Sequence, residues 1–321
     1  MRYSSKTNTC LHLFLICISF LQLPAQTLSR DQIYLADPTV FEDNGTYYLY
    51  GTKEDNTRKG EGFLVYTSTD LKHWAGPVGA TDGFALKKGA AYGTKGFWAP
   101  QVFKRKATYY MAYTANENIA IATSDSPLGP FVNNNTALDA PVKQIDPFVF
   151  FDNGNVYLYH VRLQEGNRIF VAEMNEDLLS IKPETLKECI YAEEPWEDTA
   201  NTDWTVAEGP SVFKHESLYY LVYSANDFRN PDYAVGYATS TTPLGPWKKS
   251  TESPIISSVL TGEPGSGHGD LFYDRRGEMQ YVLHTHFSEE KVGPRKTGVV
   301  KLQFKKNYLG AKKGSFRWVR R

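Results

Sequence analysis

One β-hairpin sequence, repeated along the chain, constrains the fold of this 321-residue protein more than any other feature. In residues 36–50, ADPTVFEDNGTYYLY, an Asp-Pro precedes an apolar run, the dipeptide Asn44-Gly45 and a second run rich in tyrosine. Asn-Gly adopts the positive φ angles of a two-residue turn, and the flanking residues favour strands. Copies of this hairpin begin at 99–103, at 146–150 with Asn153-Gly154, at 209–213 and, in degenerate form with Gly277 at the turn, at 269–273.

Five copies of one unit predict an all-β repeat protein. Residues 38, 100, 147, 210 and 270 are equivalent, so each unit is more than 40 residues long and can hold several strands, which is typical of a β-propeller. A β-sandwich is the alternative, but it does not predict five copies of one hairpin. We therefore expect a five-bladed β-propeller, formed by residues 26–321 as a single domain and closed by pairing of 315–321 with the N-terminal residues. Further strands are expected at 62–68, 118–124, 168–173, 234–240 and 297–304.

The first 25 residues have the pattern of a secretory signal peptide. Arg2 and Lys6 precede an apolar run at 11–23, and Ala25 is a small residue suited to cleavage before Gln26. The run is short for a membrane anchor, which is the alternative. Lipidation at Cys17 is disfavoured because the large residue Ile16 precedes it. We expect an exported protein, periplasmic or extracellular, without a membrane anchor.

Charge and composition narrow the class of partner. The chain has 35 Lys and Arg residues against 36 Asp and Glu, with no basic stripe, so nucleic acid is not expected as a partner. Cys189 is the one cysteine beyond the signal peptide, so no intrachain disulfide is expected. Aromatic residues make up 14% of the chain. Aromatic rings fill β-cores and stack on sugars, so this composition fits a protein that acts on carbohydrate.

Polar residues that differ between the copies occupy one shared position, the start of each hairpin. In a propeller the innermost strands line the central channel, so these positions should meet in space although about 60 residues separate them. They bring together Asp37, Trp98, Asp146, Glu208 and His268. Each residue alone has a structural explanation, since Asp-Pro commonly begins a strand or turn and a single histidine is usually hydrogen-bonded within the fold. Their shared position favours a functional site built on the repeat.

Three carboxylates in one site favour acid–base chemistry. Burial and like charge separate carboxyl pKa values, so that one group keeps its proton while another is ionised. Glycoside hydrolysis requires such a pair, an acid for the leaving oxygen and a base for water. Glu208 lies one residue earlier in the repeat than Asp37 and Asp146, so we expect it to project from another wall. Its longer side chain suits delivery of a proton.

Five motifs resemble those of glycoside hydrolase family 43, whose members are five-bladed propellers that remove sugars from plant polysaccharides with inversion. The resemblance covers essentially all of 26–321. One such motif alone would be weak, but five in order at blade spacing are specific. The motifs are ADP at 36–38, FWAP at 97–100, IDP at 145–147, EGP at 208–210 and GHGD at 267–270.

The resemblance implies a role for each candidate residue. Asp37 is similar to the general base, Glu208 to the general acid, and Asp146 to a third carboxylate that raises the pKa of the acid and orients it or the sugar. Arg295 is similar to an arginine that contacts the sugar. Trp98 is expected to line the pocket.

His268 is similar to a histidine near a cation on the propeller axis. Calcium prefers six to eight oxygen ligands, and the sequence shows no Asp-rich loop. Water would therefore supply most ligands of a Ca²⁺ or other cation at His268. No cofactor is expected to be required, and the presence of this cation is left open.

The resemblance predicts an exo-acting, inverting glycosidase that releases pentose side chains from plant cell-wall polysaccharide, with α-L-arabinofuranosidase as the leading activity. β-Xylosidase, endo-arabinanase and galactofuranosidase remain alternatives, although the chain lacks the C-terminal β-sandwich of many β-xylosidases. A non-catalytic carbohydrate-binding propeller would lack a carboxylate, and a protein-interaction propeller would need none. Loops at 53–62, 81–96, 193–204 and 228–233 should decide between exo and endo action, and their aromatic residues offer stacking surfaces: Phe84, Trp196, Trp204, Phe228 and Tyr233.

Overall fold

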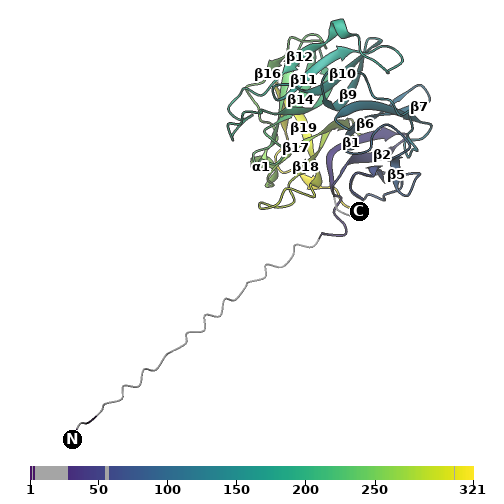
Figure 1. The fold of residues 1–321 in the computed structure, drawn as a ribbon. Helices are drawn as coiled ribbons and strands as arrows, with labels where there is room; N and C mark the ends of the chain where they lie inside the picture. The colour runs from purple at the N-terminus through teal and green to yellow at the C-terminus, as the bar shows by residue number, and fades with distance from the viewer. Residues whose placement is uncertain (2, 4–27, 55–57, 307) are drawn as a thin grey trace. The chain divides into compact units, whose positions relative to one another are not determined.

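Five β-blades form a propeller in the computed structural model, which describes residues 1, 3, 28–54, 58–306 and 308–321 (Figure 1). All strands belong to the compact unit Asp31–Arg321. Apart from Met1 and Tyr3, the predicted signal peptide and its cleavage point lie outside the described residues. Within the described part of the chain, no helix has the length and apolar character needed to cross a membrane.

Each blade is antiparallel, and its first strand is one copy of the repeated hairpin strand. Blade 1 contains β1 (Leu35–Asp43), β2 (Thr46–Lys53) and β4 (Tyr66–Ser68), beside the pair β3 (Gly62–Leu64) and β5 (Phe84–Lys87). Blade 2 contains β6 (Trp98–Arg105), β7 (Thr108–Ala115) and β8 (Asn118–Ser124). Blade 3 contains β9 (Gln144–Asp152), β10 (Asn155–Leu163), β11 (Asn167–Glu173) and β12 (Lys187–Ile190).

The last two blades follow the same order. Blade 4 contains β13 (Ala207–His215), β14 (Leu218–Ala225), β15 (Ala234–Ser240) and β16 (Lys248–Lys249). Blade 5 contains β17 (Gly267–Tyr273), β18 (Met279–Thr285), β19 (Lys296–Lys305), β20 (Tyr308–Ala311) and β21 (Arg317–Trp318). Short helical turns lie in two connections, η1 (Pro183–Thr185) and α1 (Ser258–Thr261).

The predicted hairpins and third strands are confirmed, with one exception. Asn44 and Gly45 have φ angles of 50° and 78°, as the two-residue turn requires. The strand expected at 62–68 divides at Val65, because its N–H donates to the Gly83 carbonyl and its carbonyl accepts from the N–H of Val78. β3 therefore pairs with β5, whereas β4 pairs with β2.

A β-bulge interrupts the inner strand of every blade, at the residue before the repeat proline or, in the fifth blade, before Gly269. These residues have positive φ angles, which are uncommon outside glycine. Bulges are frequent beside active sites because they re-aim side chains. The five residues and their φ angles are Asp37 (48°), Ala99 (43°), Asp146 (54°), Gly209 (62°) and His268 (36°).

Four of the five bulges are held by a side chain on the second strand of the preceding blade. That side chain accepts a hydrogen bond from the backbone N–H of the bulge residue, and the acceptors stand at equivalent positions. The pairs are Ala99 with Thr52 (3.0 Å), Asp146 with Thr114 (2.9 Å), His268 with Ser224 (2.7 Å) and Asp37 with His284 (3.1 Å). This ring of bonds fixes the five inner-strand ends relative to one another.

The equivalence expected between Asp270 and the repeat proline is wrong, because Asp270 pairs with Val282 as Thr39 pairs with Tyr50, which places Gly269 at the position of Pro38. The carboxylate of Asp270 joins three blades. The hydroxyl of Thr39 on β1 donates to its Oδ2 over 2.7 Å, and the hydroxyl of Ser211 on β13 donates to its Oδ1 over 2.6 Å. Burial raises the pKa of Asp270, and the two hydroxyls oppose that rise. Asp270 is therefore a buried residue that links the first, fourth and fifth blades.

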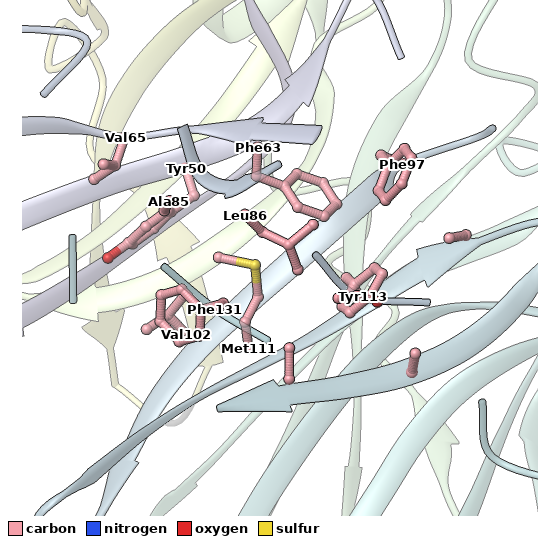
Figure 2. Packing of buried hydrophobic residues seen from close by; sticks show 14 of the residues in the cluster. Tyr50, Phe63, Val65, Ala85, Leu86, Phe97, Val102, Met111, Tyr113 and Phe131 are labelled. Carbon is pink, nitrogen blue, oxygen red and sulfur yellow. The ribbon is translucent and has the colours of Figure 1, made fainter. Parts of the chain in front are cut away.

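Aromatic side chains fill the core between blades, as the composition predicted. Figure 2 shows this packing between blades 1 and 2. The ring of Phe63 meets Phe97 and Tyr113 edge-on, at centroid distances of 5.9 and 5.6 Å. Such pairs add to the free energy gained by burial alone.

The C-terminal residues close the ring, as predicted. β21 pairs with β19 of blade 5, and the N–H of Ile33 donates to the Val319 carbonyl over 3.2 Å. The N–H of Arg321 donates to the Asp31 carbonyl over 2.7 Å. The last residues of the chain therefore bond to both the fifth blade and the segment that leads into the first.

Candidate active site

One cavity of about 520 Å³ lies at the bulged ends of the inner strands, and all six residues singled out from the sequence line it. Its volume falls within the range of roughly 300–1,000 Å³ typical of small-molecule sites. Each blade contributes to its wall. The predicted residues are Asp37, Trp98, Asp146, Glu208, His268 and Arg295, and they are joined there by Thr52, Glu54, Asn167, Trp204, Asp227, Phe228 and Arg229 among others.

Asp37 is buried among groups that favour its ionised form. Its Oδ2 accepts the Thr52 hydroxyl over 2.6 Å, and its Oδ1 accepts from the Arg295 guanidinium over 3.1 Å. His268 Nδ1 lies 3.3 Å from the same Oδ1. Burial alone would raise the pKa of Asp37, but Arg295, His268 and Thr52 together lower it below its ordinary value. Asp37 is therefore a carboxylate near neutral pH.

Glu208 lies on another wall, as expected, and has the opposite tendency. Its Oε1 accepts the Tyr233 hydroxyl over 2.8 Å, and its Oε2 accepts the Asn167 amide over 2.8 Å. Burial raises the pKa of Glu208 to about 7, against the effect of these two donors and with the help of the negative charge on Asp37. Near neutral pH, Glu208 therefore has a substantial protonated fraction.

Asp146 is also buried, and its pKa is raised well above the ordinary value by burial and by the charges of Glu208 and Asp37. The backbone N–H of Gly209 donates to its Oδ2 over 3.3 Å, which partly opposes that rise. Gly209 follows Glu208 directly, so this bond ties Asp146 to the strand that carries Glu208. The charge of Glu208 thus adds to burial in raising the pKa of Asp146, so that Asp146 retains a proton more readily than an exposed aspartate.

Arg295 contacts protein carboxylates, which the sequence did not predict. Its Nε and Nη2 bind the two carboxylate oxygens of Glu54 over 3.0 and 2.7 Å, while its Nη1 reaches Asp37. Its guanidinium also lies 4.5 Å from the centroid of the Phe228 ring. Arg295 is therefore held rigidly beside Asp37, at the cavity wall where a sugar would also meet it.

His268 lies between the two aspartates, 3.3 Å from Asp37 and 3.9 Å from Asp146. Burial lowers its pKa, so the ring is mainly neutral near neutral pH. Among the described residues, no three His, Cys, Asp or Glu side chains are grouped so as to hold a metal ion. The cation suggested at His268 thus gains no support from these side chains.

The aromatic residues of the surrounding loops divide into cavity wall and core. Trp98, Trp204 and Phe228 line the cavity, and the side chains of Trp98 and Trp204 are 38% and 50% exposed. Phe84 is fully buried, and Trp196 packs on Tyr223 in the core. Neither ring lines the cavity, and both pack against apolar side chains of the blades. Tyr233 is buried as well, and its hydroxyl donates a hydrogen bond to Glu208.

Of the four loops expected to shape the site, 53–62, 193–204 and 228–233 contribute several wall residues between them, while 81–96 contributes Gly96 alone. Sequence reasoning missed Thr52, Glu54 and Asn167. Thr52 could have been found, because it is one of the equivalent second-strand positions. Glu54 and Asn167 lie outside the repeated motifs, so comparison of the copies could not identify them.

Comparison with known proteins agrees with this geometry. The profile of glycosyl hydrolases family 43 matches residues 32–308. A solved structure described as an endo-1,4-β-xylanase from Bacteroides thetaiotaomicron is 40% identical, covers 91% of this chain and 98% of its own, and superposes with a TM-score of 0.83.

Two curated relatives carry names of other activities. The xylosidase/arabinosidase 43A of Humicola insolens is 29% identical over 61% of this chain and 73% of its own. The β-D-galactofuranosidase xynD of Aspergillus niger is 23% identical over 79% of this chain and 74% of its own. The match to the family covers the inner strands of all five blades, with the carboxylates at their ends, so this chain belongs to glycosyl hydrolase family 43 and is a glycoside hydrolase.

Proposed function

We propose that this protein releases terminal pentose residues from xylan- or arabinan-type polysaccharide by inverting hydrolysis, with Asp37 as general base and Glu208 as general acid. One observation carries the assignment. The two carboxyls share one cavity, and their surroundings lower the pKa of Asp37 while raising that of Glu208 to about 7. Opposite shifts in neighbouring carboxyls are the pattern of an acid–base pair.

In this mechanism the ionised Asp37 takes a proton from water as the water oxygen attacks the anomeric carbon. Glu208 gives its proton to the glycosidic oxygen as the bond between that oxygen and the anomeric carbon breaks. Water attacks the face opposite the leaving group, so the released sugar has the inverted configuration. Arg295 and Thr52 hold the carboxylate of Asp37 in place. Asp146 accepts the N–H of Gly209, the residue after Glu208, and so helps to hold the strand that carries the acid.

Several observations support the choice of substrate. The cavity is walled by Trp98, Trp204 and Phe228, which suits the apolar faces of sugar rings, and the wall drawn from all five blades favours action at a chain end. α-L-Arabinofuranosidase remains the leading activity. β-Xylosidase is the second candidate, because the structure that is 40% identical is described as an endo-1,4-β-xylanase and one relative is named a xylosidase/arabinosidase. The signal-like segment supports export to the periplasm or the medium.

A substrate panel tests this function. The purified chain is assayed with nitrophenyl α-L-arabinofuranoside, β-D-xyloside and β-D-galactofuranoside, and with arabinoxylan and arabinan oligosaccharides. We expect arabinose to be released fastest, whereas faster release of xylose would establish the second candidate. Asp37→Asn and Glu208→Gln should each lower kcat on the oligosaccharides by roughly a hundredfold to ten-thousandfold. Full activity of either variant would contradict the assignment.

A further inference from the structure

The side-chain amide of Asn167 lies between Glu208 and the half-exposed ring of Trp204. Its Nδ2 donates to Glu208 Oε2 over 2.8 Å. Its Oδ1 accepts the indole N–H of Trp204 over 2.9 Å. All three residues line the cavity. A continuous path of two hydrogen bonds therefore connects a cavity-wall aromatic ring to the candidate acid.

The backbone of Asn167 is fixed against the segment that leads into β13. Asn167 begins β11, its N–H donates to the Thr205 carbonyl over 2.9 Å, and it forms a parallel bridge with Val206. Gly166 before it has a φ of 117°, and a Cβ there would lie 2.7 Å from the same carbonyl oxygen, so glycine is required. Blade 3, which is next to the blade of Glu208, therefore holds the backbone of Asn167 in a fixed position.

Trp204 determines which end of the amide faces Glu208. An asparagine amide can present its oxygen or its nitrogen in nearly the same position, and the hydrogen-bond partners decide between them. The indole N–H can only donate, so it requires the oxygen of Asn167. The NH₂ group is then directed at Glu208. The Tyr233 hydroxyl on the other oxygen of Glu208 can both donate and accept, so it imposes no such direction.

We propose that Asn167 is a positioning residue for Glu208 and that Trp204 fixes the orientation of its amide. The inference rests on the proposed role of Glu208 as general acid. When Glu208 releases its proton, negative charge develops on its carboxylate, and the Asn167 N–H stabilises that charge. A sugar ring stacked on Trp204 would hold the indole in place, so binding there would prepare the acid for proton transfer.

The other charged groups around Glu208 are arranged independently of this path. They are Asp37 on β1, Asp146 on β9, and Asp227 and Arg229 on the segment after β14, with the Tyr233 hydroxyl in direct contact. Asp227 and Arg229 form an ion pair with each other. Changing Asn167 or Trp204 removes no charge, so its effect on Glu208 is an effect of the hydrogen bonds.

The test measures how kcat/KM depends on pH and compares the alkaline limb, the pH range where kcat/KM falls as pH rises, in three variants: Asn167→Ala, Trp204→Phe and Trp98→Phe. Asn167→Ala removes a donor to the carboxylate, and Trp204→Phe keeps a ring but frees the amide to turn. Each should move the limb to higher pH, by roughly half to one unit for Asn167→Ala. kcat on oligosaccharides should fall more than kcat on nitrophenyl glycosides, which need less protonation. Trp98→Phe changes a second ring of the same cavity and should leave the limb in place.

An unmoved limb in both Asn167→Ala and Trp204→Phe would overturn the inference while leaving the proposed function intact. A limb that moves as far in Trp98→Phe would also overturn it. Full activity of Glu208→Gln on oligosaccharides would instead overturn the proposed function, and this inference with it. Trp204 is half exposed, so Trp204→Phe decides the matter even where Asn167→Ala fails to fold.

Discussion

At the scale of single residues, the neighbours of Asp37 and Glu208 account for their opposite behaviour. Both carboxyls are buried, and burial raises the pKa of each. Asp37 has a guanidinium 3.1 Å away, whereas the donors that contact Glu208 among the described residues, Tyr233 and Asn167, are neutral. Arg295 is in turn held by Glu54, so a residue on the loop after β2 helps to keep the base ionised.

These shifts predict a bell-shaped dependence of kcat/KM on pH. Asp37 must be ionised, and its pKa is lowered, so activity is lost only as pH falls below the ordinary range of an aspartate. Glu208 must be protonated, so activity is lost as pH rises through about 7. In Arg295→Gln the positive charge beside Asp37 is gone, the pKa of Asp37 rises, and the acid limb should move to higher pH. Steady-state assays between about pH 3 and pH 9 would measure both limbs of the profile.

Arg276→Gln is the matched control, since this arginine is 71% exposed and pairs with Asp274 and Glu278 outside the cavity. Neither limb should move in that variant. An acid limb that stays in place in Arg295→Gln would show that Arg295 does not set the ionisation of Asp37.

The repeat in the sequence was sufficient to bring the three carboxylates together, because equivalent positions of a propeller meet at its axis. It could not predict what surrounds them. Asn167 approaches Glu208 from the third strand of blade 3, and Glu54 approaches Arg295 across 241 positions of sequence. These two contacts have no equivalents in the other copies of the repeat, so comparison of the copies could not predict them.

At the scale of strands, blade 3 breaks the ring of bonds that holds the bulges. The equivalent of Thr52, Thr114, Ser224 and His284 in this blade is Val161, which pairs with Ile145 and has no acceptor atom in its side chain. The N–H of Gly209 is therefore free to bond Asp146 instead. The hairpins could be predicted from the repeat and, in two copies, from an Asn-Gly turn. The positive φ angles of the bulges could not, because residues as different as aspartate, alanine and histidine occupy the bulge position.

Val161→Thr should therefore reduce activity. The new hydroxyl would accept from Gly209 N–H and take that donor from Asp146, whose pKa would rise further. A hydrogen bond to a charged group contributes about 1.5–3 kcal/mol, so kcat should fall by roughly tenfold or more at a pH near 6. Steady-state kinetics on a correctly folded variant would measure it.

Val171→Thr controls for the cost of a buried hydroxyl. Val171 is fully buried in the same core cluster, on the neighbouring strand β11. Both variants should lose similar stability, and only Val161→Thr should lose activity well below its melting temperature. Equal activity of the two variants would contradict the role given to the missing acceptor.

At the scale of the whole molecule, stability depends on how the ring is closed. The C-terminal segment bonds to the residues before β1, and Val319 packs into the core cluster that contains Leu35 and Val299. This closure was predictable because a propeller must join its last blade to its first. The path of the segment was not predictable, since the backbone N–H of Trp74, after β4, also donates to the Arg320 carbonyl.

Val319→Ala should destabilise the protein by roughly 1.5–3 kcal/mol, through lost burial and the cavity left behind. Val319 is 1% exposed, whereas Val132 is 46% exposed and serves as the control. Val132→Ala should change the free energy of unfolding by less than about 0.5 kcal/mol. Chemical denaturation of both variants would give the two values, and equal values would show that the closing segment contributes little.

The configuration of the first sugar released tests the proposed mechanism most directly. Proton NMR of an early reaction mixture distinguishes the two anomers before they interconvert in water. With Asp37 activating water and Glu208 protonating the leaving oxygen, the first product should have the configuration opposite to that of the substrate. A first product with the configuration of the substrate would contradict the account, because it would require a covalent glycosyl-enzyme intermediate.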